Sequence, residues 1–477
     1  MSNFCIRVIC LLGASLMATH ALSQYMAEWS DGTVCRLVES DGGAEYVEEA
    51  TSRGLDCHPP IKSATAKPTK PKNEVITYFG NRGDTDMPNN IEWQPNDVTL
   101  SHYYKMTDRL RFDMERTYTV DPSDDPVVFV KKIEQHKVIA REMATKTAFS
   151  YLYYEDGVVI YDAMPPEGRF TMALDNSSYF QSHSIGKSIT SYIIGHAICE
   201  GYIKSIDAPI ADWPFMENTL YYGQPLIQLL NMSAGDGNVI KSGEINFIKT
   251  GRSAHGNAPL ITAAKNPLEL ANTKPISSSR FSYSDLTTSV LFSYMMYRVG
   301  SDFDNFMDNF YQNKVRIKHP VYLDMNPLEG RPHFQSTEDR IKQGAGRFGV
   351  SATRYDYLRI AKAMVDDWKN DTCEGKYLKS IYDRRVSTNR RTGTWNKKDR
   401  RWGEPDFNSV STRYGGQFWT DIVGLHRRHV LVMFGLGGST VAMDMDNSRI
   451  VVINAIKEKH VNIKKLAYEP LKYGRIR

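Results

Sequence analysis

Residues 180–201 read FQSHSIGKSITSYIIGHAICEG, and this stretch predicts a buried helix with reactive side chains at its N-terminal end. Ser184 and Lys187 are three positions apart, so a helix beginning near Ser184 places the hydroxyl and the amine on the same side. A partly desolvated amine can act as base to such a hydroxyl, and the free N–H groups of the first turn can stabilise an oxyanion. Helical spacings of three and four relate Ile185, Ile189, Tyr192, Ile193, His196 and Ala197.

The alternative is a helix that opens with a polar cap and carries a solvent-facing lysine. A single Ser-x-x-Lys is a weak signal in a chain of this length. This match is the only one in the sequence, and a strongly apolar helix follows it directly. Those two facts favour a reactive serine with a lysine base over a polar helix cap with a solvent-facing lysine.

The N-terminal part predicts export and a small separate module. Residues 1–23 resemble a secretory signal peptide, with Arg7 before a short apolar run and small residues at its end. Residues 24–60 form a cysteine-containing module in which Cys35 and Cys57 are a disulfide candidate, and the partner of this module is unknown. Residues 61–73 are rich in Lys, Pro and Thr and predict a solvated linker. We therefore expect a periplasmic or secreted protein.

Charge and cysteine content exclude several classes of partner. The formal net charge is +4 with both signs interspersed, so no basic footprint of a nucleic-acid-binding protein is present. No segment after residue 23 reaches the length of an apolar transmembrane helix. Cys199 lies in the apolar helix and is interpreted as a buried thiol rather than as a partner of Cys373. No Cys/His spacing matches a zinc site, and no metal or organic cofactor is expected.

Residues 74–477 predict one α+β domain. Residues 147–163 form two apolar runs around an Asp-Gly turn, the pattern of a β-hairpin. Helical periodicity marks 286–299 and 355–368, within a middle section, 200–390, that we expect to be mostly helical or irregular. Four further strands are predicted at 418–423, 429–435, 440–445 and 450–455. Strands at both ends with helices between them favour one largely antiparallel sheet with helices on its faces.

A glycine-rich stretch at 344–349 matches Gly-x-Gly-x-x-Gly. No strand pattern precedes it and no βαβ unit surrounds it, so the stretch is not interpreted as a dinucleotide site. We expect a glycine-rich loop that enters a helix at 352–364.

Two further segments supply what a site at Ser184 and Lys187 would still need, which is a group to relay a proton and a turn that a substrate can approach closely. FSYSD at 281–285 places a phenol, Tyr283, and a carboxylate, Asp285, before an apolar helix, where the tyrosine can relay a proton. FGLGGS at 434–439 lies between two predicted strands, and its glycines allow close approach of a substrate. An ordinary loop tyrosine and a plain hairpin turn are the alternatives.

Together these segments resemble the serine β-lactamase and penicillin-binding-protein superfamily, and more closely its class C-like branch with esterases and 6-aminohexanoate-dimer hydrolases. The resemblance spans roughly residues 125–470. It is carried by SIGKS (184–188), LLNMSAGDG (229–237), FSYSD (281–285), the 344–362 loop and helix, YGGQFW (414–419) and FGLGGS (434–439).

The resemblance implies an antiparallel sheet flanked by helices beside an all-helical subdomain, with the site between them. It implies that Ser184 is the acylated nucleophile, Lys187 its base and Tyr283 the residue of proton transfer. It further implies an oxyanion hole made by the amides of Ser184 and of a residue in 436–439, with Ser439 favoured and Gly438 beside it.

Two departures from the family pattern bear on the substrate. Leu436 stands where β-lactam-processing members have lysine and many esterases have histidine, so it cannot attract a substrate carboxylate. Asp285 stands where asparagine is usual and adds negative charge near the substrate. Both favour a neutral or cationic ester or small amide. The alternatives are a β-lactamase or D,D-peptidase, and a catalytically silent binding protein on the same fold.

Overall fold

The computed structural model divides the chain into two units, Met1–Val75 and Ile76–Arg477, which are considered separately. It describes residues 44–55, 100, 117–171, 173–217, 219–235, 280–325, 346–389, 393–395, 405–456 and 461–477. In the first unit it describes the helix α3 (Ala44–Ser52). The predicted signal peptide, the Cys35 and Cys57 pair and the linker at 61–73 lie outside the described residues.

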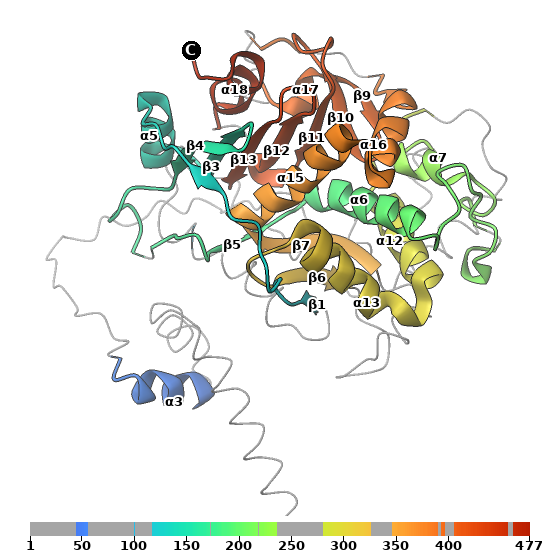
Figure 1. The fold of residues 1–477 in the computed structure, drawn as a ribbon, viewed down its shortest axis with the longest axis horizontal. Coiled ribbons are helices and arrows are strands. Elements are labelled where there is room, and N and C mark those ends of the chain that lie inside the picture. The colour runs from blue at the N-terminus through green and yellow to red at the C-terminus, as the bar shows by residue number, and fades with distance from the viewer. Residues whose placement is uncertain are drawn as a thin grey trace, which may run out of the picture. The chain divides into compact units, whose positions relative to one another are not determined.

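The second unit is built on a nine-stranded sheet with the order β2-β4-β3-β13-β12-β11-β10-β9-β8 (Figure 1). Neighbouring strands are antiparallel except for β2 and β4, which run parallel. The α+β class and the predicted sheet, built from both ends of the domain, are confirmed. The strands are β2 (Val130–Lys131), β3 (Ala148–Glu155), β4 (Val158–Ala163), β8 (Val386–Ser387), β9 (Ser411–Gly415), β10 (Phe418–Ile422), β11 (Val430–Phe434), β12 (Thr440–Asp444) and β13 (Arg449–Ala455).

The predicted hairpin joins β3 to β4. Asp156 and Gly157 have φ angles of 43° and 96°, and positive φ at both central residues is what a tight hairpin turn needs. The pairing places strands from the two ends of the domain side by side, because β3 also pairs with β13.

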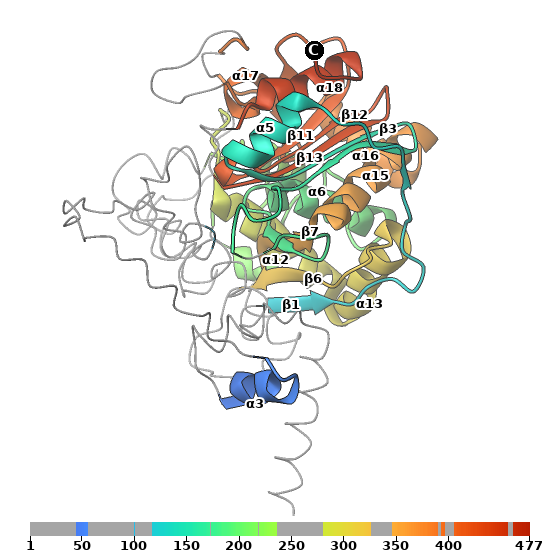
Figure 2. The ribbon, with the colours of Figure 1, turned by 90° about the vertical axis from the view of Figure 1, so that its left-hand side faces the viewer.

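Helices cover both faces of this sheet (Figure 2). The strand side chains alternate between two apolar clusters. Leu431 and Met433 of β11 belong to one cluster, and Val430 and Val432 to the other. The first cluster includes side chains of α6 (Ile185–Cys199), α12 (Asp285–Val299), α15 (Arg354–Asn370) and α16 (Cys373–Asp383). The second includes side chains of α5 (Lys137–Thr145), α17 (Phe407–Val410), the π-helix η6 (Lys464–Tyr468) and α18 (Glu469–Tyr473).

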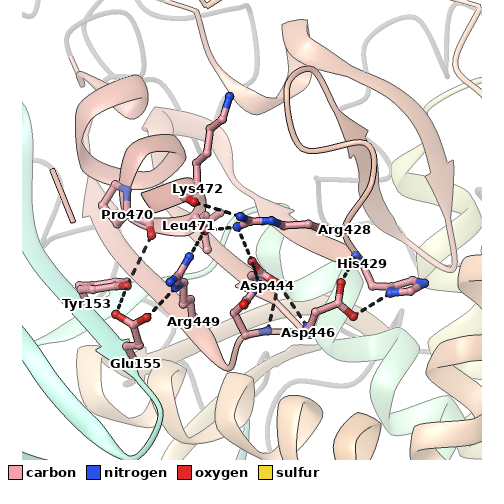
Figure 3. Close-up of polar contacts among 11 residues, drawn as sticks. Tyr153, Glu155, Arg428, His429, Asp444, Asp446, Arg449, Pro470, Leu471 and Lys472 are labelled. Atoms are coloured by element: carbon pink, nitrogen blue, oxygen red, sulfur yellow. Dashed lines mark hydrogen bonds and ion pairs between the residues drawn. The ribbon is translucent and has the colours of Figure 1, made fainter. Parts of the chain in front are cut away.

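The C-terminal helix α18 is fixed to the sheet by two arginines (Figure 3). Arg428 donates hydrogen bonds to the backbone oxygen of Leu471, at 2.8 Å, and to Asp444 Oδ2, at 3.0 Å. Arg449 donates to the same Leu471 oxygen, at 2.9 Å, and to Glu155 Oε1, at 2.7 Å. The last carbonyl groups of a helix have no partner within it, so these guanidinium groups satisfy them and join α18 to β12, β13 and β3.

A second, four-stranded antiparallel sheet was not predicted. Its order is β1-β6-β7-β5, with β1 (Thr117–Val120), β5 (Tyr179–Gln181), β6 (Val321–Met325) and β7 (Gly346–Thr353). The expectation of a glycine-rich loop is therefore wrong for residues 346–349, which begin β7, and the helix starts at Arg354 instead of 352. The strand forms because β6 and β5, distant in sequence, pair with its two edges.

Apart from β6, β7 and β8, the described residues of the middle section are helical or irregular, as expected. Besides α12, α15 and α16, they include the 3₁₀-helix η1 (Pro214–Met216), α7 (Leu226–Leu230), the 3₁₀-helix η2 (Gly300–Asp302), α13 (Phe303–Asp308) and the π-helix η3 (Asn309–Val315). Among the described residues, no helix is long and apolar enough to cross a membrane.

The interpretation of Cys199 as a free buried thiol is wrong. Cys199 forms a disulfide with Cys373, and this bond joins the end of α6 to the start of α16. The two residues are 174 positions apart, so the pairing depends on how α6 and α16 pack together and could not be read from spacing.

Candidate active site

Ser184 lies at the turn where β5 passes into α6, as the N-cap residue of the helix. His183, directly before it, has a φ of 47°, an uncommon backbone conformation for a residue with a side chain. Ser182 holds the turn to β7, because its backbone N–H donates to Val350 O at 2.7 Å and its Oγ accepts from Val350 N at 2.9 Å. The turn leaves Ser184 half-buried, at the positive end of the helix dipole.

The amine of Lys187 lies directly beside this hydroxyl. Lys187 is 1% exposed, and its Nζ donates a hydrogen bond to Ser184 Oγ at 2.9 Å. The expected side-by-side placement of hydroxyl and amine is therefore present, and the alternative of a solvent-facing lysine is wrong.

Asp285 brings a carboxylate to the same amine. Its Oδ1 lies 2.6 Å from Lys187 Nζ, and its side chain is 21% exposed. Ser284 caps the helix by accepting a hydrogen bond from Thr287 N, so Asp285 is the first residue of α12. A buried ammonium is costly unless a charge partner compensates it, and Asp285 supplies that partner.

Tyr283 presents its ring rather than its hydroxyl to Lys187. The ring centroid lies 5.0 Å from Nζ, and the ring stacks on Trp419 at a centroid distance of 5.8 Å. Among the described residues, the tyrosine hydroxyl has no hydrogen bond to Ser184 or Lys187. The proton-relay role of Tyr283 therefore stays a prediction, which requires the hydroxyl to move or a substrate to bridge the distance.

Phe348 is a site residue that the sequence interpretation missed. Its ring centroid lies 3.7 Å from Lys187 Nζ, so a second aromatic face covers the amine. A Cβ atom built on Gly186 would lie 1.8 Å from Phe348 O, which means that only glycine allows β7 to approach α6 here. The signal in the sequence is Gly186 itself, because glycine inside a helix costs about 1 kcal/mol relative to alanine and needs a packing reason.

The glycine turn after β11 lies against the residues that precede the serine. A Cβ atom on Gly435 would lie 2.6 Å from Ser182 O and 3.4 Å from His183 Cβ. Gly437 and Gly438 have φ angles of 85° and 88°, so the turn depends on glycine at both positions. The structure thus brings the 434–439 segment to the N-terminal side of Ser184, where the oxyanion hole is expected.

The side chain of Ser439 is not directed to a substrate. Its Oγ donates to Ala455 O at 3.2 Å and accepts from Ala455 N at 3.1 Å, and the residue is fully buried. Any part that Ser439 takes in an oxyanion hole falls to its backbone, as expected from the sequence. Leu436, at the start of the turn, is half-buried, and the roles of Leu436, Gly438 and Ser439 stay predictions.

The electrostatics of the site favour a neutral histidine before the nucleophile. Burial, and then the positive charge of Lys187, lower the pKa of His183 to about 4 from the usual 6.5. His183 is therefore uncharged at neutral pH.

The helix α6 rests on a buried polar cluster behind the site. Tyr192 donates a hydrogen bond to Asp367, and His196 Nδ1 lies 2.8 Å from Glu374 Oε1. Lys314 pairs with both carboxylates, each at 3.0 Å. These contacts connect α6, which carries Tyr192 and His196, to α15 through Asp367 and to α16 through Glu374.

Among the described residues, no group of three or more His, Cys, Asp and Glu side chains is arranged to hold a metal ion.

Comparison with known proteins gives similarities among solved structures only. No protein-family model and no curated protein sequence matches the chain. A Bacillus anthracis protein named as a 6-aminohexanoate-dimer hydrolase matches with 13% identity and a TM-score of 0.49, over 85% of this chain and 97% of that one. The class C β-lactamase of Rhodobacter sphaeroides matches with 14% identity and a TM-score of 0.41, over 69% of this chain and 94% of that one.

A third solved structure is the octameric penicillin-binding-protein homologue from Pyrococcus abyssi, with 16% identity and a TM-score of 0.41, over 69% of this chain and 73% of that one. The chain is similar in fold to these proteins. They are the kinds of protein that the sequence motifs resemble, and the resemblance itself stays an interpretation of those motifs. The similarities concern the fold alone, and the chemistry proposed below rests on the geometry around Ser184.

Proposed function

We propose that this protein is an exported serine hydrolase that cleaves an ester or small amide through an acyl-enzyme on Ser184. The observation that carries the proposal is the buried amine of Lys187, 2.9 Å from the hydroxyl of a half-buried serine at a helix N-terminus. A nucleophile within hydrogen-bond reach of a base, at the positive end of a helix dipole, is an arrangement suited to acyl transfer.

In this reaction Ser184 Oγ attacks the carbonyl carbon of the substrate while its proton passes to the uncharged amine of Lys187. The carbon–oxygen or carbon–nitrogen bond then breaks, and the leaving group takes a proton from the Lys187 and Tyr283 side of the site. Water, deprotonated by the same base, attacks the acyl-enzyme, and the acid product leaves as Ser184 regains its proton. No metal or organic cofactor takes part in these steps.

The charges around Ser184 support a neutral or cationic substrate. The Asp285 carboxylate is partly exposed beside Lys187, and the half-buried Leu436 offers no positive charge to a substrate carboxylate. A substrate that carries its own carboxylate near the scissile bond would be repelled by Asp285. This charge pattern favours simple esters and amides over β-lactams and peptide termini.

Export is supported by two features of the chain. Residues 1–23 have the pattern of a signal peptide, and the Cys199–Cys373 disulfide is typical of proteins in oxidising compartments. We therefore place the mature protein in a periplasm or outside the cell.

Steady-state hydrolysis of short-chain p-nitrophenyl esters, anilides and a chromogenic cephalosporin tests the proposed activity. We expect turnover of esters or anilides, little turnover of the cephalosporin, and a loss of about 10³-fold or more in the Lys187→Met variant. Lys379→Met, which removes a half-buried lysine paired with Asp371, is the control and should leave the rate unchanged. Preferred turnover of the cephalosporin would instead support a β-lactamase, and no turnover of any substrate would support a silent binding protein.

A further inference from the structure

Gln417 occupies the turn between β9 and β10 in a conformation that favours glycine. Gly416 and Gln417 have φ angles of 56° and 71°, so both central residues of this hairpin turn are left-handed. Glycine and asparagine are the residues preferred there, and another side chain in that conformation costs on the order of 1 kcal/mol or more. Strain of this kind persists where the surrounding contacts require the side chain.

The contacts of Gln417 reach the two helices that carry the site. Its Oε1 accepts a hydrogen bond from Thr288 Oγ1 at 2.9 Å, and its backbone oxygen accepts one from Ser188 Oγ at 2.6 Å. Thr288 lies in the first turn of α12, three residues after Asp285, and Ser188 directly follows Lys187 in α6. One residue therefore connects the helix of the base to the helix of its carboxylate partner.

Gln417 is also anchored to α7. Its backbone N–H donates to Leu230 O at 2.9 Å, and its Nε2 donates to Leu229 O at 3.1 Å and to Leu230 O at 3.0 Å. These oxygens belong to the last turn of α7, where helix carbonyls need an outside partner. The residue is 2% exposed and uses its amide oxygen, its amide nitrogen and both backbone polar groups.

We propose that Gln417 is a positioning residue that holds α6 and α12 at the separation needed for Lys187 to meet Ser184 and Asp285 together. This inference rests on the proposed serine chemistry. The buried amide links the β9–β10 turn to Thr288 through a hydrogen bond, so its loss should allow α12 to move relative to α6. A displacement of about 1 Å in a catalytic arrangement can reduce a rate on the order of 10²-fold.

Gln417→Gly and Thr288→Val test this role from its two sides. The first removes the side chain and relieves the positive φ, and the second removes only the hydroxyl that donates to Oε1. The rate constant for fluorophosphonate labelling at Ser184 should fall about tenfold or more in each variant, with little further loss in the double variant, because both remove the same connection. Ser448→Gly is the control, since Ser448 has a φ of 51° in the β12–β13 turn and contacts Lys369 instead of the site.

Labelling rates within twofold of wild type in both single variants, or losses that add in the double variant, would overturn the proposal. If Gln417→Gly does not fold, Thr288→Val alone decides by the same criterion. Thermal unfolding of the four proteins in the cycle separates this inference from the proposed function. If the wild type is not labelled at all, the proposed serine chemistry is wrong. The Tm values of the four proteins still test the link between Gln417 and Thr288 in that case, because additive changes in Tm would overturn it.

Discussion

The amine of Lys187 lies between Ser184 Oγ, at 2.9 Å, and Asp285 Oδ1, at 2.6 Å, and these two partners favour opposite charge states of the amine. The hydroxyl needs an uncharged amine to lose its proton, whereas the carboxylate stabilises the ammonium form. Residue 285 therefore affects how readily Lys187 accepts and holds the proton of Ser184.

Replacing Asp285 with asparagine should shift the pH–rate profile of ester hydrolysis to lower pH. The ammonium form loses the carboxylate that stabilises its charge, so the uncharged amine becomes available at a lower pH. Initial rates between pH 5 and 10 measure the shift, and Asp366→Asn, an exposed carboxylate paired with Lys362, is the control. An unshifted profile would show that Asp285 does not act on the base.

His183 predicts a pH dependence of stability on the acid side. Its pKa is about 4 in the folded protein against 6.5 for an unperturbed histidine, so the unfolded chain binds the proton more readily. The stabilising contribution is therefore complete above about pH 6.5 and is lost as the pH falls toward about 4. Asn tolerates the positive φ, so Tm measured from pH 4 to 7.5 should fall less steeply in His183→Asn. Parallel curves for the two proteins would be inconsistent with this interpretation.

Gly186→Ala should disturb the base without touching any charged group. The new methyl group would clash with Phe348 O at 1.8 Å, so β7 must move away from α6. Overpacking of this kind costs about 1–3 kcal/mol, and the ring of Phe348 should leave the Lys187 amine. The free energy of unfolding, measured by chemical denaturation, and the rate of ester hydrolysis should both be lower than in the wild type. Gly393→Ala, where the nearest atom is at 3.4 Å, is the control and should behave as wild type.

The Cys199–Cys373 disulfide should contribute strongly to stability. It closes a loop between residues 174 positions apart, and native disulfides contribute about 2–5 kcal/mol, chiefly by restricting the unfolded chain. The Cys199→Ser and Cys373→Ser variants should therefore have equally lowered Tm values, and reducing agent should lower the Tm of the wild type to the same level. A wild-type Tm insensitive to reductant would mean that the bond is not formed in solution.

The sequence predicted the elements whose signals are local. Helical spacing identified α6, an Asp-Gly turn identified the β3–β4 hairpin, and four runs identified β10 to β13. The second sheet escaped prediction because β6 is buried at every position and shows no alternation, while β7 begins with glycines. Two of its three strand pairs, β1–β6 and β5–β7, join segments more than a hundred residues apart.

The site was predictable to a similar degree. Ser184 and Lys187 were expected side by side and Asp285 near the substrate, whereas the ion pair between Asp285 and Lys187 was not predicted. The three side chains meet because the start of α6 and the start of α12 adjoin. Phe348 and Gln417 carry no distinctive residue chemistry, and their importance comes from where β7 and the β9–β10 turn pack. Such positions are recognised only from distances in the folded chain.

The most direct test of the central claim is the intact mass of the mature protein after exposure to a fluorophosphonate, beside its Ser184→Ala variant. The structure predicts one adduct on the wild type and none on the variant, because only a serine next to a base and an oxyanion hole is reactive enough to be labelled. An unlabelled but folded wild type, or an adduct that persists in Ser184→Ala, would contradict the account.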